Sequence, residues 1–290
     1  MAKESASYKT EVIVALFKKR WDESSRSVSD PLVTLNEVSD AIREYNAAHP
    51  ERRKPVSDRN PANFFKDIIR HRAPGNQMWP KWIFECGYTA RQVTGENSCF
   101  EFAHIVPGQT EPFPSHVPEP SAATPAMKIS SVSMPLASRR LGRSDESWLI
   151  QVVVRLRIID THLALFSSRR VIQVDHLQTG VKLGKNEIDA ILLAIEETDA
   201  GTSESIVCCE AKSIKEDVIE EQLIGHVKSV FASLPISQNV AIPICVKTIA
   251  KSKIRVLEFG AVERRDAQDL LQLAIVSDAI YELVPPVPGI

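Results

Sequence analysis

Apolar residues in the first third of the chain follow helical spacing and then change to strand-like alternation. Residues 8–21 carry apolar side chains three and four positions apart, and the sequence Thr34-Leu35-Asn36-Glu37 has the capping-box pattern that opens a second helix. A third helix is predicted over 60–69, with proline at its first turn. Residues 82–86 and 98–102 alternate and predict two strands around a polar turn. The pattern therefore predicts three helices followed by a hairpin.

The second half of the chain is predicted to mix helices with strands. Apolar residues at 148, 152, 156, 159 and 163 indicate one long helix, and a strand hairpin is predicted from 171–174 and 187–194. The apolar run at 205–212 predicts a buried strand. The remaining predicted elements are a helix at 216–231, strands at 240–246 and 254–259, and a closing helix at 267–283.

Between the two halves lies a segment rich in Pro, Ser and Thr without apolar periodicity. Such a composition is typical of a semi-extended linker. We therefore predict a front domain over 1–106, a linker over 107–145 and a second domain over 146–290. A chain of 290 residues has the length for two modest domains.

Composition narrows the class of protein. The chain is 43% hydrophobic and 25% charged, which is typical of globular proteins. No run of eighteen apolar residues occurs, and the first residues lack the basic-then-apolar build of a secretory signal. The five cysteines are odd in number and form no C-x-x-C pair, which argues against a disulfide framework. We expect a cytoplasmic protein without a membrane span.

Basic residues are concentrated in the front half. Lys and Arg number 16 against 14 Asp and Glu over 1–106, but 15 against 19 over 147–290. Within 52–72 there are seven basic and two acidic residues, a net charge of +5. Together with three helices and a hairpin, this charge resembles a winged helix-turn-helix that binds double-stranded DNA. The candidate DNA-binding residues are Arg52, Arg53, Lys54, Arg59, Asn63, Lys66 and Arg70. The alternative is a solvated basic face on a protein-interaction domain.

Charged residues at the end of the buried strand carry the candidate chemistry. In a strand, residues two apart point to the same side, so Glu210 and Lys212 emerge together while Cys209 and Ala211 face the other way. Asp189 on the adjoining predicted strand completes a group of two carboxylates and one ammonium. Carboxylate oxygens are the ligands that Mg²⁺ prefers, and we expect Asp189 and Glu210 to hold this ion.

This arrangement resembles the PD-(D/E)XK nuclease superfamily, in which an acidic residue precedes a (D/E)-x-K triplet on a buried strand. The matching residues are Ile188-Asp189 and Glu210-Ala211-Lys212, and the resemblance covers 147–260. It implies an α/β fold, with a restriction-endonuclease-like core of a mixed central sheet flanked by helices behind the winged-helix-like domain. It also implies catalytic roles for Glu187 and Gln222.

The sequence departs from the family pattern at two points. Ile188 stands where the family name has proline, and the upstream acid that family members carry on a helix has no obvious match. Glu146 precedes the predicted helix and Asp160 lies within it, and a solvated role is the more common one for a residue placed like Asp160.

A specificity module joined to a metal-dependent core resembles type II restriction endonucleases. The resemblance implies a homodimer that cuts both strands of DNA, with Lys212 positioning water and Gln222 supporting it. One alternative is another defence or repair endonuclease, either modification-dependent or structure-specific. A second is a non-catalytic DNA-binding regulator, and a third is a protein-interaction scaffold.

Overall fold

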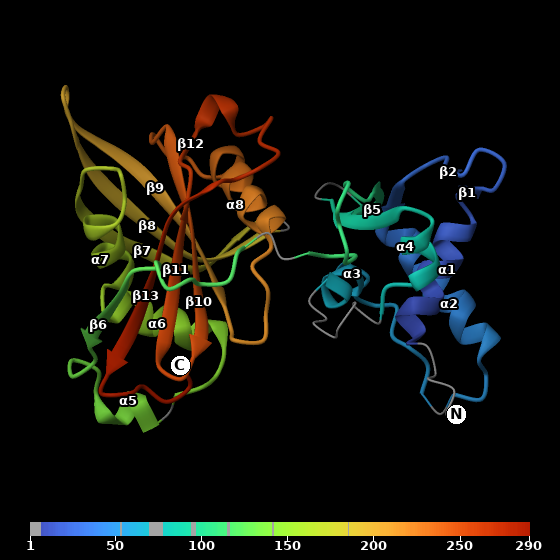
Figure 1. Cartoon of the computed structure of the whole chain (residues 1–290), viewed down its shortest axis with the longest axis horizontal. Coiled ribbons are helices and arrows are strands. Elements are labelled where there is room, and N and C mark those ends of the chain that lie inside the picture. Colours follow the sequence, from blue (N-terminus) through green and yellow to red (C-terminus); the bar gives the residue numbers. More distant parts are fainter. Residues whose placement is uncertain are drawn as a thin grey trace. The chain divides into compact units, whose positions relative to one another are not determined.

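The computed structural model describes residues 7–52, 54–69, 78–93, 97–114, 117–140, 142–184 and 186–290. The chain forms two compact units, which divide between Pro114 and Ser115 (Figure 1). Each unit has its own hydrophobic core, so each is described by itself.

Unit 1 contains the three predicted helices. They are α1 (Tyr8–Lys18), α2 (Leu35–Ala48) and α3 (Ala62–Ile69). The predicted capping box opens α2: the Glu37 backbone N–H donates to Thr34 Oγ1 at 3.2 Å, and Glu37 Oε2 accepts from the Thr34 backbone N–H at 2.8 Å. Each helix turns its apolar face to one core, where Phe17, Phe64 and Ile68 are buried.

A three-stranded antiparallel sheet completes this unit. Its strands are β3 (Leu32–Thr34), β5 (Ser98–His104) and β4 (Tyr88–Gln92), in that spatial order, while β1 (Trp21–Asp22) and β2 (Ser27–Val28) form a separate ribbon. The strand predicted at 82–86 is wrong, because these residues belong to helix α4 (Lys81–Glu85). Pro80 precedes α4 and Gly87, at φ +88°, follows it, so the segment is bounded by a typical helix start and stop.

Much of the predicted linker at 107–145 has regular or packed structure. On the unit 1 side, Phe113 packs edge-on against Trp79 with ring centroids 5.2 Å apart. On the unit 2 side, β6 (Ala126–Ser130) pairs with the main sheet and α5 (Leu136–Arg140) follows it. One aromatic anchor and a five-residue edge strand are too short to produce a periodic signal among prolines.

Unit 2 is built on a large mixed sheet, which confirms the predicted α/β class. The strands run in the order β6-β13-β11-β10-β9-β8-β7, with β12 beside β10. The pairs β9–β10 and β13–β6 are parallel and the others are antiparallel. The strands are β7 (Val171–Leu183), β8 (Asn186–Thr198), β9 (Gly201–Lys212), β10 (Val240–Ala250), β11 (Lys253–Phe259), β12 (Val262–Glu263) and β13 (Ile275–Val284).

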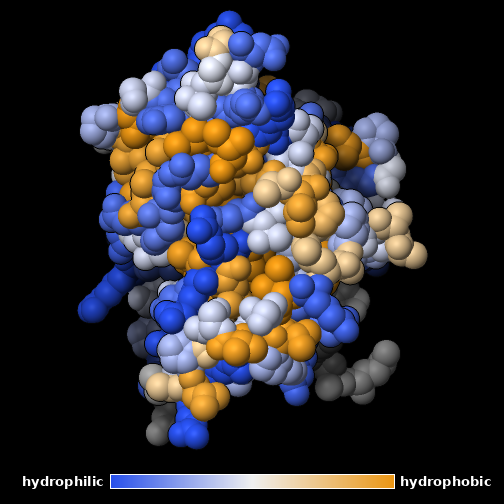
Figure 2. All heavy atoms as spheres, turned by 90° about the vertical axis from the view of Figure 1, so that its left-hand side faces the viewer, coloured by the Kyte–Doolittle hydropathy of each residue, from blue (hydrophilic) through white to orange (hydrophobic). Residues whose placement is uncertain are grey.

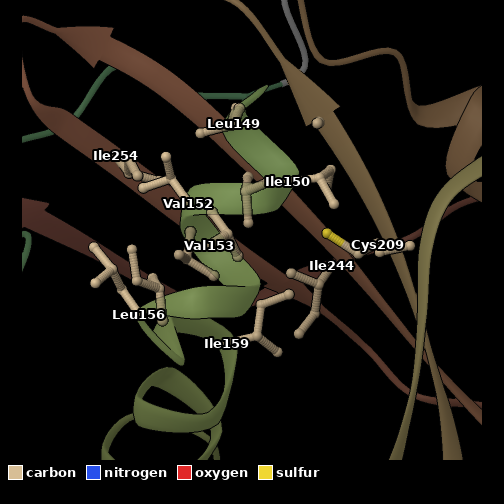
Figure 3. Packing of buried hydrophobic residues seen from close by; sticks show 14 of the residues in the cluster. Leu149, Ile150, Val152, Val153, Leu156, Ile159, Cys209, Ile244 and Ile254 are labelled. Atoms are coloured by element: carbon tan, nitrogen blue, oxygen red, sulfur yellow. The ribbon is translucent and has the colours of Figure 1, made fainter. Parts of the chain in front are cut away.

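Helices cover both faces of this sheet. The helix α6 (Glu146–Arg155) packs Leu149, Val152 and Val153 onto strand residues that include Cys209 and Ile244 (Figure 3). The helix α7 (Ile158–Leu165) contributes to the same core, whereas α8 (Glu220–Ser233) packs against a different apolar cluster of the sheet.

The single long helix predicted from residue 148 to 163 is wrong. It is interrupted at Arg157, which adopts φ +51° and ψ 44° between α6 and α7. The Arg157 guanidinium stabilises this break, because it donates to Asp160 Oδ1 at 2.7 Å and to the Val174 carbonyl at 3.2 Å. The apolar spacing continues across the break because both helices bury their faces in one core.

The closing helix predicted at 267–283 is also wrong, since residues 275–284 form β13 between β11 and β6. Ala279, Tyr281 and Leu283 are buried at every second position, and the residues between them are more exposed. Such a short apolar pattern fits both the helical period of 3.6 residues and the strand period of two. In the fold this segment lies between the edges of β11 and β6. Both edges supply backbone hydrogen-bond partners, which favours the extended form.

The strand β7 forms one edge of the sheet in the described part of the chain. Apolar and polar residues are interspersed over the face of the molecule that Figure 2 shows. Leu165 at the end of α7 and Ile172 and Leu177 on β7 are each more than half exposed. None of the helices in the described residues combines the length and apolar character needed to cross a membrane.

A buried polar network joins α7 to the sheet. His162 Nε2 lies 2.6 Å from Ser277 Oγ, His162 Nδ1 lies 3.1 Å from the Tyr281 hydroxyl, and Ser277 Oγ donates to Glu258 Oε2 at 2.8 Å. The Ser277 proton is committed to Glu258, so the His162 Nε2–H donates to Ser277 and Nδ1 accepts from Tyr281. Burial lowers the pKa of His162 to about 4, against an opposing contribution from Asp278. The imidazole is therefore neutral in the folded protein at neutral pH.

The contribution of His162 to stability is expected to fall as the pH is lowered from about 6.5 to about 4. Over this range the unfolded chain binds a proton at His162 that the folded protein excludes, so acidification favours unfolding by about 3 kcal/mol. Denaturant unfolding of the wild type and of His162→Gln at pH 7.5 and pH 4.5 measures this contribution. The variant should lose less stability between the two pH values, whereas equal losses would contradict the assignment.

Candidate metal centre

Two oppositely charged residues are buried at the end of a central strand. The strand β9 lies between β8 and β10. Among its last three residues, Glu210 is 4% exposed and Lys212 is 1% exposed. Lys212 Nζ donates to Glu210 Oε1. As predicted, the two share a side of the strand, while Cys209 and Ala211 belong to the core beneath α6. Burial of this pair is costly unless each charge is compensated, so its position calls for a functional explanation.

Asp189 reaches the same place from the neighbouring strand. At this end of the β8–β9 ladder the last pair is Ala190 and Cys209, and Asp189 directly precedes Ala190 on β8. Its Oδ2 atom accepts from the Ala211 backbone N–H at 2.8 Å, where a backbone carbonyl would otherwise continue the ladder. The carboxylate is thereby fixed beside Glu210.

Glu146 supplies a third carboxylate from α6. It is the first residue of that helix, and its Oε1 lies 3.2 Å from Lys212 Nζ. One oxygen each of Glu146, Asp189 and Glu210 lies within 4.8 Å of the others, a grouping that could hold a metal ion. The sequence offers Glu146 as one candidate for the upstream acid, beside Asp160. Its position directly after the Asp145 N-cap was the available signal.

His226 is a further residue beside the cluster, and the sequence did not indicate it. It lies on α8, is 2% exposed, and places Nε2 at 3.4 Å from Glu210 Oε2. It follows Gln222 by four positions, so the two share a face of the helix. That spacing was the only sequence signal for it.

Gln222 and Glu187, to which the family resemblance assigns catalytic roles, differ in burial. Gln222 lies on the α8 face that carries His226, and its Oε1 is buried with no hydrogen-bond partner among the described residues. Glu187 is 55% exposed at its side chain and pairs with Lys182 across the β7–β8 hairpin at 3.8 Å. The acidic grouping of Glu146, Asp189 and Glu210 does not include Glu187, and the catalytic role of Glu187 stays a prediction.

The electrostatics of the cluster are dominated by crowded carboxylates. Burial, followed by the charge of Glu210, raises the pKa of Asp189 to about 7. Burial alone would lower the pKa of Lys212, but the carboxylates of Glu210 and Glu146 outweigh it and raise that pKa above its usual range. With all groups ionised, three carboxylates and one ammonium carry a net charge of −2 that a divalent cation would neutralise.

The structure describes five of the seven predicted DNA-binding residues. Lys54, Arg59 and Asn63 are exposed before or within α3, and Lys66 is half-buried on it. Arg52 is exposed, donates to the Tyr45 hydroxyl at 3.0 Å and covers its ring. Arg53 and Arg70 lie outside the described residues.

Comparison of the chain with protein-family models, curated proteins and solved structures gave no match.

Proposed function

We propose that the protein is a Mg²⁺-dependent endonuclease that hydrolyses phosphodiester bonds of double-stranded DNA, with a PD-(D/E)XK-type core in unit 2. The observation that carries this proposal is the cluster at the end of β9, where Glu146, Asp189 and Glu210 converge on the buried ammonium of Lys212. Within this class, a type II restriction endonuclease is the function we favour.

The donor set fits a hard divalent cation. Three carboxylates each offer an oxygen, and such oxygens suit Mg²⁺ better than softer metals, which prefer Cys and His. The net charge of −2 matches one dication. When bound, Mg²⁺ would polarise a phosphate oxygen and lower the pKa of a water molecule.

The protein side chains have separate roles in this proposal. Glu146, Asp189 and Glu210 hold the cation, and the Lys212 ammonium orients the attacking water and offsets negative charge that develops on the phosphate. The unpaired Gln222 carbonyl is available to accept a hydrogen bond from that water. The buried setting strengthens each of these electrostatic contributions relative to bulk water.

The topology supports the same proposal. The cluster lies at the carboxyl end of β9, beside its parallel neighbour β10, and open α/β sheets commonly bind ligands at the carboxyl ends of their strands. A helix before the sheet, an antiparallel hairpin, the motif strand and a helix after it follow the order expected from the superfamily resemblance.

Unit 1 is proposed to bind the DNA. Apart from the short β1–β2 ribbon and α4, its elements follow the order α1, β3, α2, α3 and β4–β5 hairpin, which is typical of a winged helix. In that fold the third helix enters the major groove. The exposed residues Lys54, Arg59 and Asn63 lie at the amino-terminal side of this helix or just before it. A homodimer on a palindromic site remains part of this proposal.

Neutralising two of the basic residues should weaken DNA binding and make it less dependent on salt. Each lost phosphate contact reduces the slope of log K against log salt by about 0.9, so Lys54→Gln with Arg59→Gln should reduce it by about 2. Fluorescence anisotropy on a DNA duplex over a salt series measures the slope. The matched control is Lys19→Gln, an exposed lysine on the same unit that pairs with Glu44. Equal slopes in all three proteins would argue for a protein-interaction module instead.

A plasmid assay separates the nuclease from a DNA-binding regulator. Supercoiled plasmid incubated with the wild-type protein should become nicked or linear with Mg²⁺ and stay intact with chelator. Tight, salt-dependent binding without any cleavage would favour the regulator. Cleavage of only methylated or branched substrates would favour the modification-dependent or structure-specific enzymes.

A further inference from the structure

We infer that His226 is a positioning residue that holds Glu210 in place as a cation ligand. This inference rests on the proposed metal centre, and it concerns a residue on α8 rather than on the motif strand. Its basis is the position of His226 Nε2, 3.4 Å from Glu210 Oε2.

Glu210 is contacted at both carboxylate oxygens by two different elements. Lys212 Nζ, on the same strand, donates to Oε1, while His226 Nε2 on α8 faces Oε2. All three side chains are buried, with exposed fractions of 6% for Glu210, 1% for Lys212 and 3% for His226. A carboxylate contacted at both ends has a fixed plane, and each oxygen keeps a lone pair for a cation.

Helix α8 is itself held firmly around His226. Leu223 and Val227 are fully buried in the sheet-facing core. From the other side, the Asn186 side-chain amide donates to the Gly225 carbonyl at 3.3 Å and to Ser229 Oγ at 2.6 Å. The β7–β8 turn therefore fixes α8 directly beside His226, which fixes the ring as well.

The contact would matter because Lys212 competes with the cation for Glu210. Without a donor at Oε2, the carboxylate can rotate and present both oxygens to the ammonium, which withdraws them from Asp189 and Glu146. An imidazole N–H at Oε2 opposes that rotation, because it holds this oxygen on the side of α8. Hydrogen-bond partners of ligating groups commonly contribute about 10- to 100-fold to metal affinity.

The test compares two substitutions in the full-length protein. His226→Gln keeps an N–H donor at a similar reach, whereas His226→Met fills the same space without one. Titration calorimetry with Mn²⁺, used as a Mg²⁺ substitute, should show affinity falling about 10- to 100-fold in His226→Met and much less in His226→Gln. Thermal unfolding in chelator, for both variants, shows that the comparison is made between folded proteins.

A double-mutant cycle shows whether His226 acts through Glu210. In a Glu210→Ala background, His226→Met should change the Mn²⁺ affinity far less than it does in the wild type, because the carboxylate that His226 contacts is already absent. Equal effects in both backgrounds would overturn the inference.

The outcomes also distinguish this inference from the proposed function. Wild-type protein that binds Mn²⁺ together with a His226→Met variant that binds it equally well would overturn the role of His226 and leave the metal centre standing. Wild-type protein that binds no Mn²⁺ would overturn both. The Asn186→Ala variant offers a second test if His226→Met does not fold, since loosening α8 should weaken Mn²⁺ binding in the same direction.

Discussion

A Lys212→Met variant is expected to lose DNA cleavage by at least about a thousandfold while it keeps the wild-type affinity for duplex DNA. Lys212 is the buried ammonium beside the three carboxylates, and methionine preserves much of its volume without its charge. The substitution removes the group that is proposed to orient water and to offset developing negative charge. Unit 1, where DNA binding is proposed, is unchanged. Cleavage rates on plasmid and anisotropy on a duplex measure the two quantities separately.

The same variant should also reveal the electrostatics of the cluster. Without metal, removal of the ammonium leaves buried Glu210 uncompensated, which is expected to cost about 3–5 kcal/mol of stability. Mg²⁺ should restore part of this loss, because the carboxylates that are proposed to bind it are still present. A Lys212→Met protein that cleaves DNA at the wild-type rate would overturn the assignment of Lys212.

An Asp189→Asn variant is expected to lose the stabilisation that a divalent cation gives the wild type. Binding to the folded protein alone adds about 2.7 kcal/mol at a ligand concentration 100 times Kd. Asparagine keeps an oxygen that can accept from the Ala211 N–H, but it removes the charge that attracts the cation. Thermal unfolding with Mg²⁺ or chelator measures the difference.

Glu197→Gln provides the matched control for Asp189→Asn. Glu197 lies on the same strand, is 53% exposed at its side chain and pairs with Arg170 at 2.5 Å. This variant should keep the full response to Mg²⁺. A wild-type protein whose stability is unaffected by Mg²⁺, Mn²⁺ or Ca²⁺ would contradict the metal centre itself.

The results expected for Lys212→Met and Asp189→Asn differ in cation binding. Lys212→Met is expected to lose catalysis but to keep cation binding, whereas Asp189→Asn is expected to lose both. A purely structural role for the cluster predicts that both variants merely lower stability, with or without Mg²⁺.

The strand-borne half of the site could be predicted from the sequence. The period of two along β9 places Glu210 and Lys212 on one side, and a hairpin before it brings Asp189 next to that side. These relations follow from local geometry, because β8 and β9 are consecutive antiparallel strands. The capping box at Thr34 was predictable for the same reason.

The helix-borne half could not be predicted. Glu146 is 64 residues before Glu210, and its approach to Lys212 depends on how α6 crosses the sheet. His226 reaches Glu210 only because the phase of α8 is set by its packing and by Asn186. Likewise, the apolar pattern at 275–284 suits a helix or a strand, and only the open edge between β11 and β6 decides.

The central claim is tested most directly by incubating purified wild-type protein and its Asp189→Ala variant with unmethylated phage and plasmid DNA, with Mg²⁺ or with chelator. Discrete fragments from the wild type with Mg²⁺, and intact DNA in the other three reactions, are the result that the proposed function predicts. Fragments that appear equally with Asp189→Ala, or in chelator, would contradict a metal-dependent nuclease built on this cluster.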